Sequence, residues 1–217
     1  MLALKRARIQ AGDTLIEVLF AVTVFSLVAV GGLAIMNKGI TTSQRALEIT
    51  LVRQEIDAQA ETLRFLQHSY VAAYKSGATY PVSTPAGQWA SMITSITSTG
   101  TVNASSFGTA SSCNAPPAGS FVLNSRKATF VPPSAGVLQP AQIYSRVMFD
   151  VSDNISALVG QGAQGIWIEG VRSATSGDPN QANAGYTDFH IRACWSSPGQ
   201  SMPVTLGTIV RLYEPRG

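Results

Sequence analysis

A long apolar run near the start of the chain limits what the protein can fold into. Residues 18–36, VLFAVTVFSLVAVGGLAIM, carry no charged side chain, and with residues 15–16 they make an apolar run of about 20 residues, enough to cross a membrane as a helix. Three basic side chains precede the run: Lys5, Arg6 and Arg8. The positive-inside bias therefore predicts a cytoplasmic N-terminus and places the residues after Lys38 outside.

The net charge of +3 belongs to the same short leader. Its three basic residues lie before Gly12, where there is no acidic residue, and the rest of the chain carries 12 side chains of each sign. An excess of basic residues would favour nucleic acid or an anionic membrane as a partner, and the chain after Gly12 has no such excess. Only 12% of residues are charged and 45% are hydrophobic, which is typical of a weakly charged extracytoplasmic protein.

The stretch AGDTLIEVLFAVTVF, residues 11–25, resembles the class III cleavage motif of type IV prepilins. The resemblance implies that a membrane prepilin peptidase cuts between Gly12 and Asp13, that the new N-terminus is methylated, and that Glu17 becomes the fifth mature residue. The first mature residue of the family is commonly phenylalanine, so Asp13 departs from the pattern at the position that would be methylated. Aspartate suits the first turn of a helix, where the macrodipole favours a negative charge.

A different cut would make the run a secretory signal. Such a signal is cleaved after its apolar core, and VGGLA at residues 30–34 offers the small residues that this cleavage needs. The run is long for a signal core, which favours the cut after Gly12.

Glu17 stands near the start of the apolar run. An acidic side chain at the centre of a membrane costs roughly 2.5–3.5 kcal/mol, so it is a candidate functional residue by default. The resemblance implies pairing with the freed α-amine of an adjacent subunit, which would make Glu17 a check on axial register during assembly. Alternatively, the carboxylate reaches back to the lipid headgroups.

Helical periodicity continues beyond the apolar run. Residues 41–66 contain neither proline nor glycine, and an apolar stripe recurs at helical spacing: Ala46, Ile49, Ile56, Ala60 and Leu63. The pattern predicts one helix from about residue 14 to 66, half in the membrane and half on a globular head. Gly31 and Gly32 predict a soft spot within it or, alternatively, close packing between helices.

The remainder of the chain predicts a head built mainly from strands. Residues 76–120 are rich in Ser, Thr, Gly, Ala and Pro and predict a long loop. Five segments predict an antiparallel meander, at 120–131, 145–151, 165–172, 186–195 and 205–214, with a short helix at 153–159. The expected fold is α+β and pilin-like: leader 1–12, membrane helix 13–37, soluble helix 38–70 and head 71–217.

The two cysteines, Cys113 and Cys194, are far apart and show no CxxC spacing. An isolated pair beyond a membrane segment predicts one disulfide, which would stabilise the fold by roughly 4 kcal/mol in the chain-entropy model. Two unrelated buried thiols are the alternative. The resemblance favours the disulfide, because pilins staple the C-terminal part of the head.

No pattern predicts an active site, a cofactor or a metal. GQGAQG at 160–165 matches GxGxxG, but it precedes a predicted strand, whereas a dinucleotide loop follows one. His68 and His190 are the only histidines, and neither has the spacing of a zinc ligand set. We therefore expect a protein that is not an enzyme.

The expected function is that of a structural subunit of a type IV pilus or a related filament, as a minor pilin or pseudopilin. Its partners would be the prepilin peptidase, the pilus assembly platform and other pilin subunits, and it would pass from the cytoplasmic membrane to a cell-surface filament. Two rivals remain: a single-pass anchored surface protein that never polymerises, and a competence-type DNA receptor. The DNA receptor would need a basic cluster, for which the candidates are Arg126, Lys127, Arg146, Arg172 and Arg192.

Overall fold

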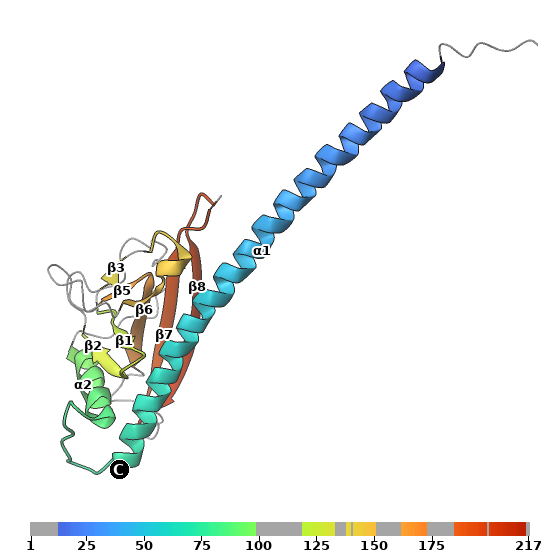
Figure 1. Ribbon diagram of the computed structural model, residues 1–217. Helices are drawn as coiled ribbons and strands as arrows, with labels where there is room; N and C mark the ends of the chain where they lie inside the picture. Colours follow the sequence, from blue (N-terminus) through green and yellow to red (C-terminus); the bar gives the residue numbers. More distant parts are fainter. Residues whose placement is uncertain are drawn as a thin grey trace, which may run out of the picture. The chain divides into compact units, whose positions relative to one another are not determined.

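The computed structural model describes residues 13–98, 119–132, 138–139, 141–150, 162–172, 185–198 and 200–215. The chain forms two units, Met1–Leu47 and Glu48–Gly217, and we call the second unit the head. One helix, α1 (Asp13–Ala73), begins in the first unit and ends in the head (Figure 1). The predicted α+β layout, with one long apolar N-terminal helix and a C-terminal antiparallel sheet, is confirmed.

The largest sheet of the head has three antiparallel strands in the order β6-β7-β8 (Figure 1). Its strands are β6 (Ile166–Arg172), β7 (Tyr186–Trp195) and β8 (Val204–Tyr213). In β7, buried and half-buried side chains alternate up to Ala193, as expected for a strand with one face on a core. The three strands predicted for this part of the sequence are therefore confirmed to within one residue.

In the described part of the chain, an antiparallel pair and a second sheet of three short strands complete the β structure. β1 (Val122–Asn124) pairs antiparallel with β2 (Thr129–Val131). β5 (Gly162–Gln164) lies between β3 (Leu138–Gln139) and β4 (Met148–Asp150), parallel to β3 and antiparallel to β4. A 3-10 turn, η2 (Tyr144–Arg146), precedes β4. The predicted strand at 145–151 is thus shorter than expected, and the predicted helix at 153–159 lies outside the described residues.

The single strand predicted at 120–131 is wrong, because a turn divides it. The Oδ1 atom of Asn124 accepts hydrogen bonds from the backbone N–H groups of Arg126 and Lys127, both at 3.1 Å. This local capture of the backbone by an asparagine ends β1 and turns the chain into β2. Ala128 completes the turn with a φ of 50°, in the left-handed region.

The loop predicted at 76–120 is also wrong in part, because residues 85–98 form a helix, α2 (Pro85–Ser98). Thr84 caps it by accepting a hydrogen bond from the backbone N–H of Gly87 at 3.1 Å, and Pro85 stands at its first position. Trp89, Met92 and Ile96 recur at helical spacing and are buried. Burial of this stripe outweighs the weak helix propensity of the surrounding serines and threonines.

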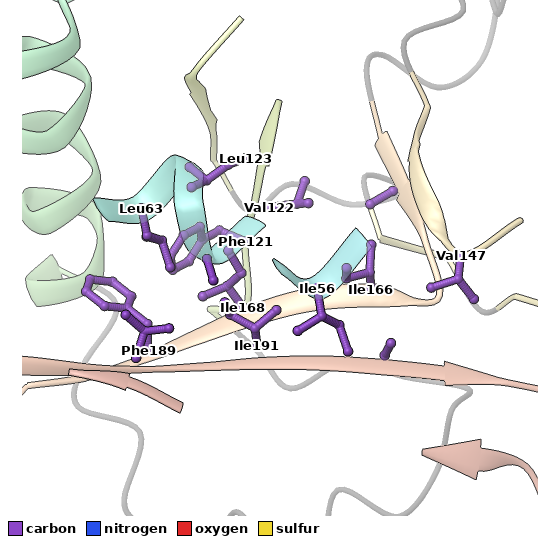
Figure 2. Close-up of a cluster of buried hydrophobic side chains, with 14 of the residues drawn as sticks. Ile56, Leu63, Phe121, Val122, Leu123, Val147, Ile166, Ile168, Phe189 and Ile191 are labelled. Carbon is purple, nitrogen blue, oxygen red and sulfur yellow. The ribbon is translucent and has the colours of Figure 1, made fainter. Parts of the chain in front are cut away.

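The core of the head lies between the last part of α1 and the β6-β7-β8 sheet. Figure 2 shows Ile56 and Leu63 of α1 among buried side chains that include Phe121, Ile168 and Ile191. Of the predicted apolar stripe, Ile56, Ala60 and Leu63 are buried, Ile49 is half-buried and Ala46 is exposed. The prediction is therefore confirmed for the part of the stripe that belongs to the head.

A buried amide also connects α1 to β1. The Nε2 atom of Gln59 donates to the backbone oxygen of Leu123 at 2.8 Å, and the backbone N–H of Leu123 donates to Gln59 Oε1 at 3.0 Å. Gln59 thus takes the place of a neighbouring strand for one residue of β1. Such pairing removes the cost of leaving a buried backbone group without a partner.

Candidate functional site

The first unit presents an apolar surface to its surroundings. We call residues 14–36 of α1 the apolar segment. Every described side chain from Thr14 to Leu47 is exposed, including large ones such as Phe25 (74% exposed) and Leu27 (76%). Among the described residues, α1 is the one helix long and apolar enough to cross a membrane, by length and composition. So large a continuous apolar patch is unusual on a water-soluble surface, and the segment is compatible with a single membrane span.

Two hydroxyl groups inside the apolar segment, those of Thr23 and Ser26, need no solvent. Thr23 Oγ1 donates to the backbone oxygen of Phe20 at 2.8 Å, and Ser26 Oγ donates to that of Val22 at 2.7 Å. Both polar side chains are therefore satisfied within the helix itself. This arrangement suits a helix whose surroundings, whether lipid or protein, offer few hydrogen-bond partners.

Glu17 is the only acidic residue between positions 14 and 47, and it lies on the exposed surface of α1. No described side chain forms an ion pair with it. The sequence-predicted cleavage site is next to this region: Asp13 is the first residue of α1, and Gly12 lies outside the described residues. The helix runs through Gly31 and Gly32 without a break, and an added Cβ at either glycine would meet no atom within 4 Å.

Where the head begins, a second carboxylate has the opposite environment. Glu48 is only 4% exposed, and its Oε2 atom accepts hydrogen bonds from Trp195 Nε1 at 3.2 Å and from Ser197 Oγ at 2.7 Å. Both donors lie at the C-terminal end of β7 or just after it. Glu48 therefore fixes α1 against the end of this strand, a role that its place in a polar stretch of the sequence did not indicate.

The second face of the sheet, turned away from α1, holds another buried carboxylate. Glu169 of β6 is 1% exposed; its Oε1 atom accepts a hydrogen bond from Trp167 Nε1 at 2.7 Å and lies 3.6 Å from Arg192 Nε. Trp167 packs on Cys194, which is buried and disulfide-bonded. Cys113 lies outside the described residues, so the pairing of Cys113 with Cys194 stays a prediction.

Gly165 explains the end of the GQGAQG stretch in structural terms. Its φ of 62° lies in the left-handed region, and an added Cβ would lie 2.6 Å from the backbone oxygen of Cys194 and 2.4 Å from Ala141 Cβ. The backbone oxygen of Gly165 also accepts a hydrogen bond from Cys194 N at 2.8 Å. The glycine is therefore required for a close approach between β5, β6 and β7.

Charged and aromatic side chains gather on the same face at β7 and β8. Arg211 donates two hydrogen bonds to Asp188, at 2.7 and 2.8 Å, and its guanidinium lies 4.0 Å from the centre of the Tyr186 ring. These hydrogen bonds from Arg211 are the main reason that the pKa of Asp188 lies below its ordinary value. Burial, and then the charge of Arg192, hold the pKa of His190 below its ordinary value of 6.5.

The basic residues considered for DNA binding are Arg126, Lys127, Arg146, Arg172 and Arg192, and the structure keeps two of them, Arg172 and Arg192, apart. Arg172 pairs with Glu214 at 2.6 Å, and Arg192 lies near the buried Glu169. Arg172 is opposite Thr187 in the sheet and Arg192 is opposite Trp167, so the two arginines point to opposite faces.

In comparisons with protein-family models, curated proteins and solved structures, the chain matches none.

Proposed function

We propose that the chain is a structural subunit of a type IV pilus or a related filament, a minor pilin or pseudopilin. In this proposal the prepilin peptidase cuts after Gly12, and the assembly platform then adds the subunit to other pilin subunits. The chain would be a single-pass protein of the cytoplasmic membrane before assembly and part of a surface filament afterwards.

The observation that carries the proposal is the exposure of the apolar segment on all sides. An amphipathic helix buries one face and leaves the other in water, but this segment has no polar face to leave there. A membrane can surround it before assembly, and the corresponding helices of neighbouring subunits can surround it afterwards. The hydroxyl groups of Thr23 and Ser26, satisfied within the helix, fit both environments.

Glu17 supports assembly rather than anchoring alone. A simple membrane anchor gains nothing from a carboxylate near its start, and burial of that charge is costly. We propose that the α-amine freed at Asp13 of a neighbouring subunit compensates it. Because the attraction is strong only at short range in an environment that excludes water, subunits in the wrong axial register would leave two charges unpaired.

The test compares two variants of the apolar segment in cells that assemble the filament. Glu17→Ala should reach the membrane and be cleaved, yet be lost from filaments sheared from the cell surface. Ser26→Ala is the matched control, because it removes a hydroxyl that only its own helix uses, and it should be incorporated normally. Normal incorporation of Glu17→Ala would remove the proposed role of this carboxylate.

The same experiment tests the alternative of an anchored surface protein that never polymerises. If the unmodified chain stays in the membrane fraction and is absent from sheared filaments, while its head is accessible on the cell surface, the alternative replaces the filament proposal.

A further inference from the structure

The outer edge of β8 is a long strand edge to which no other strand of the described residues pairs. β7 pairs with one side of β8 along its whole length, from Val204 to Tyr213, without a bulge. In the described part of the chain no strand pairs with the other side. Proline, which commonly protects exposed edges, occurs only outside the strand, at Pro203 and Pro215.

The hydrogen-bonding pattern shows which residues of β8 face this edge. The backbone N–H of Glu214 donates to the oxygen of Gly185, one position beyond the Tyr186–Tyr213 pair. Residues of an antiparallel strand bond alternately to one side and the other, so the odd-numbered residues of β8 point their N–H and C=O groups outward. Gln67 agrees with this assignment, because its Nε2 atom donates to the outward oxygen of Tyr213 at 2.9 Å.

Four more residues point their backbone groups to this edge, Thr205, Gly207, Ile209 and Arg211, and all four residues are exposed. A row of alternating backbone donors and acceptors is matched in spacing only by another extended polypeptide. The occupant of this edge is therefore a strand rather than a small molecule or a nucleic acid.

We propose that the strand is β8 of a second copy of this chain, paired antiparallel about Ile209. In this register Ile209 faces its own counterpart, and Arg211 lies opposite the partner's Gly207. Tyr213 lies opposite the partner's Thr205 in the same way, so Arg211 and Tyr213 each meet a small residue. On the other face, Leu206 meets the partner's Leu212.

Charge does not oppose this pairing. Arg211 is the only charged residue of β8, and Asp188 of its own chain neutralises it with two hydrogen bonds. The exposed side chains of Ile209 (61%) and Tyr213 (55%) would each gain a cross-strand neighbour on the same face of the joined sheet. The pair would join two three-stranded sheets into one continuous sheet.

The two-fold pairing reverses the direction of one copy relative to the other. The inference does not depend on the proposed function, because it concerns the head alone.

The test uses the full chain in detergent micelles, which cover the apolar segment. Ile209→Cys should form a disulfide-linked dimer under mild oxidation, because Cα atoms of a hydrogen-bonded pair lie about 5.5 Å apart, a distance that a disulfide spans. Arg211→Cys is the matched control: its counterpart would be four residues away along the strand, about 13 Å, so it should stay monomeric under the same conditions. Equal cross-linking of the two variants would overturn the proposal.

Sedimentation of chains without a cysteine at position 209 gives a second readout. The unmodified chain and Ile209→Val should sediment as dimers, and Ile209→Pro should sediment as a monomer with a folded head. Proline at this position removes only an outward N–H, so the ladder to β7 keeps its hydrogen bonds. If the unmodified chain sedimented as a monomer, or if Ile209→Pro sedimented as a dimer, copies of β8 would not pair.

Discussion

The two parts of α1 bury their apolar side chains in different ways. In the head, one stripe of the helix is buried and the other side is exposed, and the stripe contacts the sheet of its own chain. In residues 14–47, every described side chain is exposed, apolar ones included. The comparison shows that a single helix can combine two surfaces: an amphipathic part, which contacts the core of its own chain, and an apolar part, which is compatible with a membrane span.

The largest expected difference comes from deleting one leucine side chain in each part. Leu63 is fully buried, so Leu63→Ala should lower the free energy of unfolding of the head by about 3 kcal/mol through lost burial and a cavity. Leu27 is 76% exposed, so Leu27→Ala should leave that free energy unchanged. Denaturant unfolding of the full chain in micelles, followed by tryptophan fluorescence, measures both. Equal losses would contradict the division of α1 into two parts.

The two carboxylates of α1 provide the next comparison. Glu48→Ala leaves the buried N–H of Trp195 and hydroxyl of Ser197 without an acceptor, and it should destabilise the head by about 2 kcal/mol. Glu61→Ala, which breaks only an exposed pair with Arg64, should have a much smaller effect and is the control. Glu17→Ala should not change unfolding at all, although it should abolish incorporation into filaments. A head that tolerates Glu48→Ala would show that this carboxylate does not fix α1.

Glycine substitutions in the two parts of the molecule should change the free energy of unfolding by about half as much as Glu48→Ala. Gly170→Ala would place a Cβ 2.8 Å from Ile96 Cδ1, so the core must shift, and we expect a loss of about 1 kcal/mol in the head. Gly32→Ala meets no atom within 4 Å and should instead stabilise its helix by about 1 kcal/mol, without affecting the head. Hydrogen exchange of the backbone amides in micelles resolves the two regions. If Gly170→Ala rather than Gly32→Ala slowed the exchange around residue 32, the two substitutions would not act on separate regions.

The smallest expected effect is on the pH dependence of the head, which contains both histidines of the chain. The pKa of His190 is lowered in the folded state by burial and by Arg192, against the opposing charges of Glu169 and Asp188. The unfolded chain therefore binds a proton at His190 more readily than the folded chain does. The contribution of neutral His190 to the free energy of unfolding is fully present above pH 6.5 and is lost as the pH falls through the lower pKa of the folded state. His190→Asn should flatten the slope of the unfolding free energy just below pH 6.5. An unchanged slope would assign the pH dependence to another group.

Sequence patterns predicted the elements whose side chains alternate or recur regularly. β7 was predicted with its correct bounds, because Phe189, Ile191 and Ala193 alternate with polar residues. The composition around α2, rich in serine and threonine, favours a loop and hides the helix. Its local signals are a helix start at Thr84 and Pro85 and an apolar stripe at helical spacing: Trp89, Met92 and Ile96. The turn after Asn124 depends on one side-chain oxygen, a signal too local for periodicity to show.

The candidate site was predictable only where its chemistry is local. The charge pattern before the apolar run, and Glu17 within it, can be read directly from consecutive residues. Glu48 could not be identified in this way, because its partners Trp195 and Ser197 are about 150 residues away in the sequence. The free edge of β8 likewise depends on the order of strands in the sheet, which sequence periodicity does not fix.

The most direct test of the central claim is mass spectrometry of the N-terminus of the chain in filaments sheared from the cell surface. If the apolar segment is retained and surrounded by other subunits, the mature chain should begin at Asp13 and include residues 14–36. A chain that begins after residue 36 would show that the apolar run is a removed signal, and it would contradict the account.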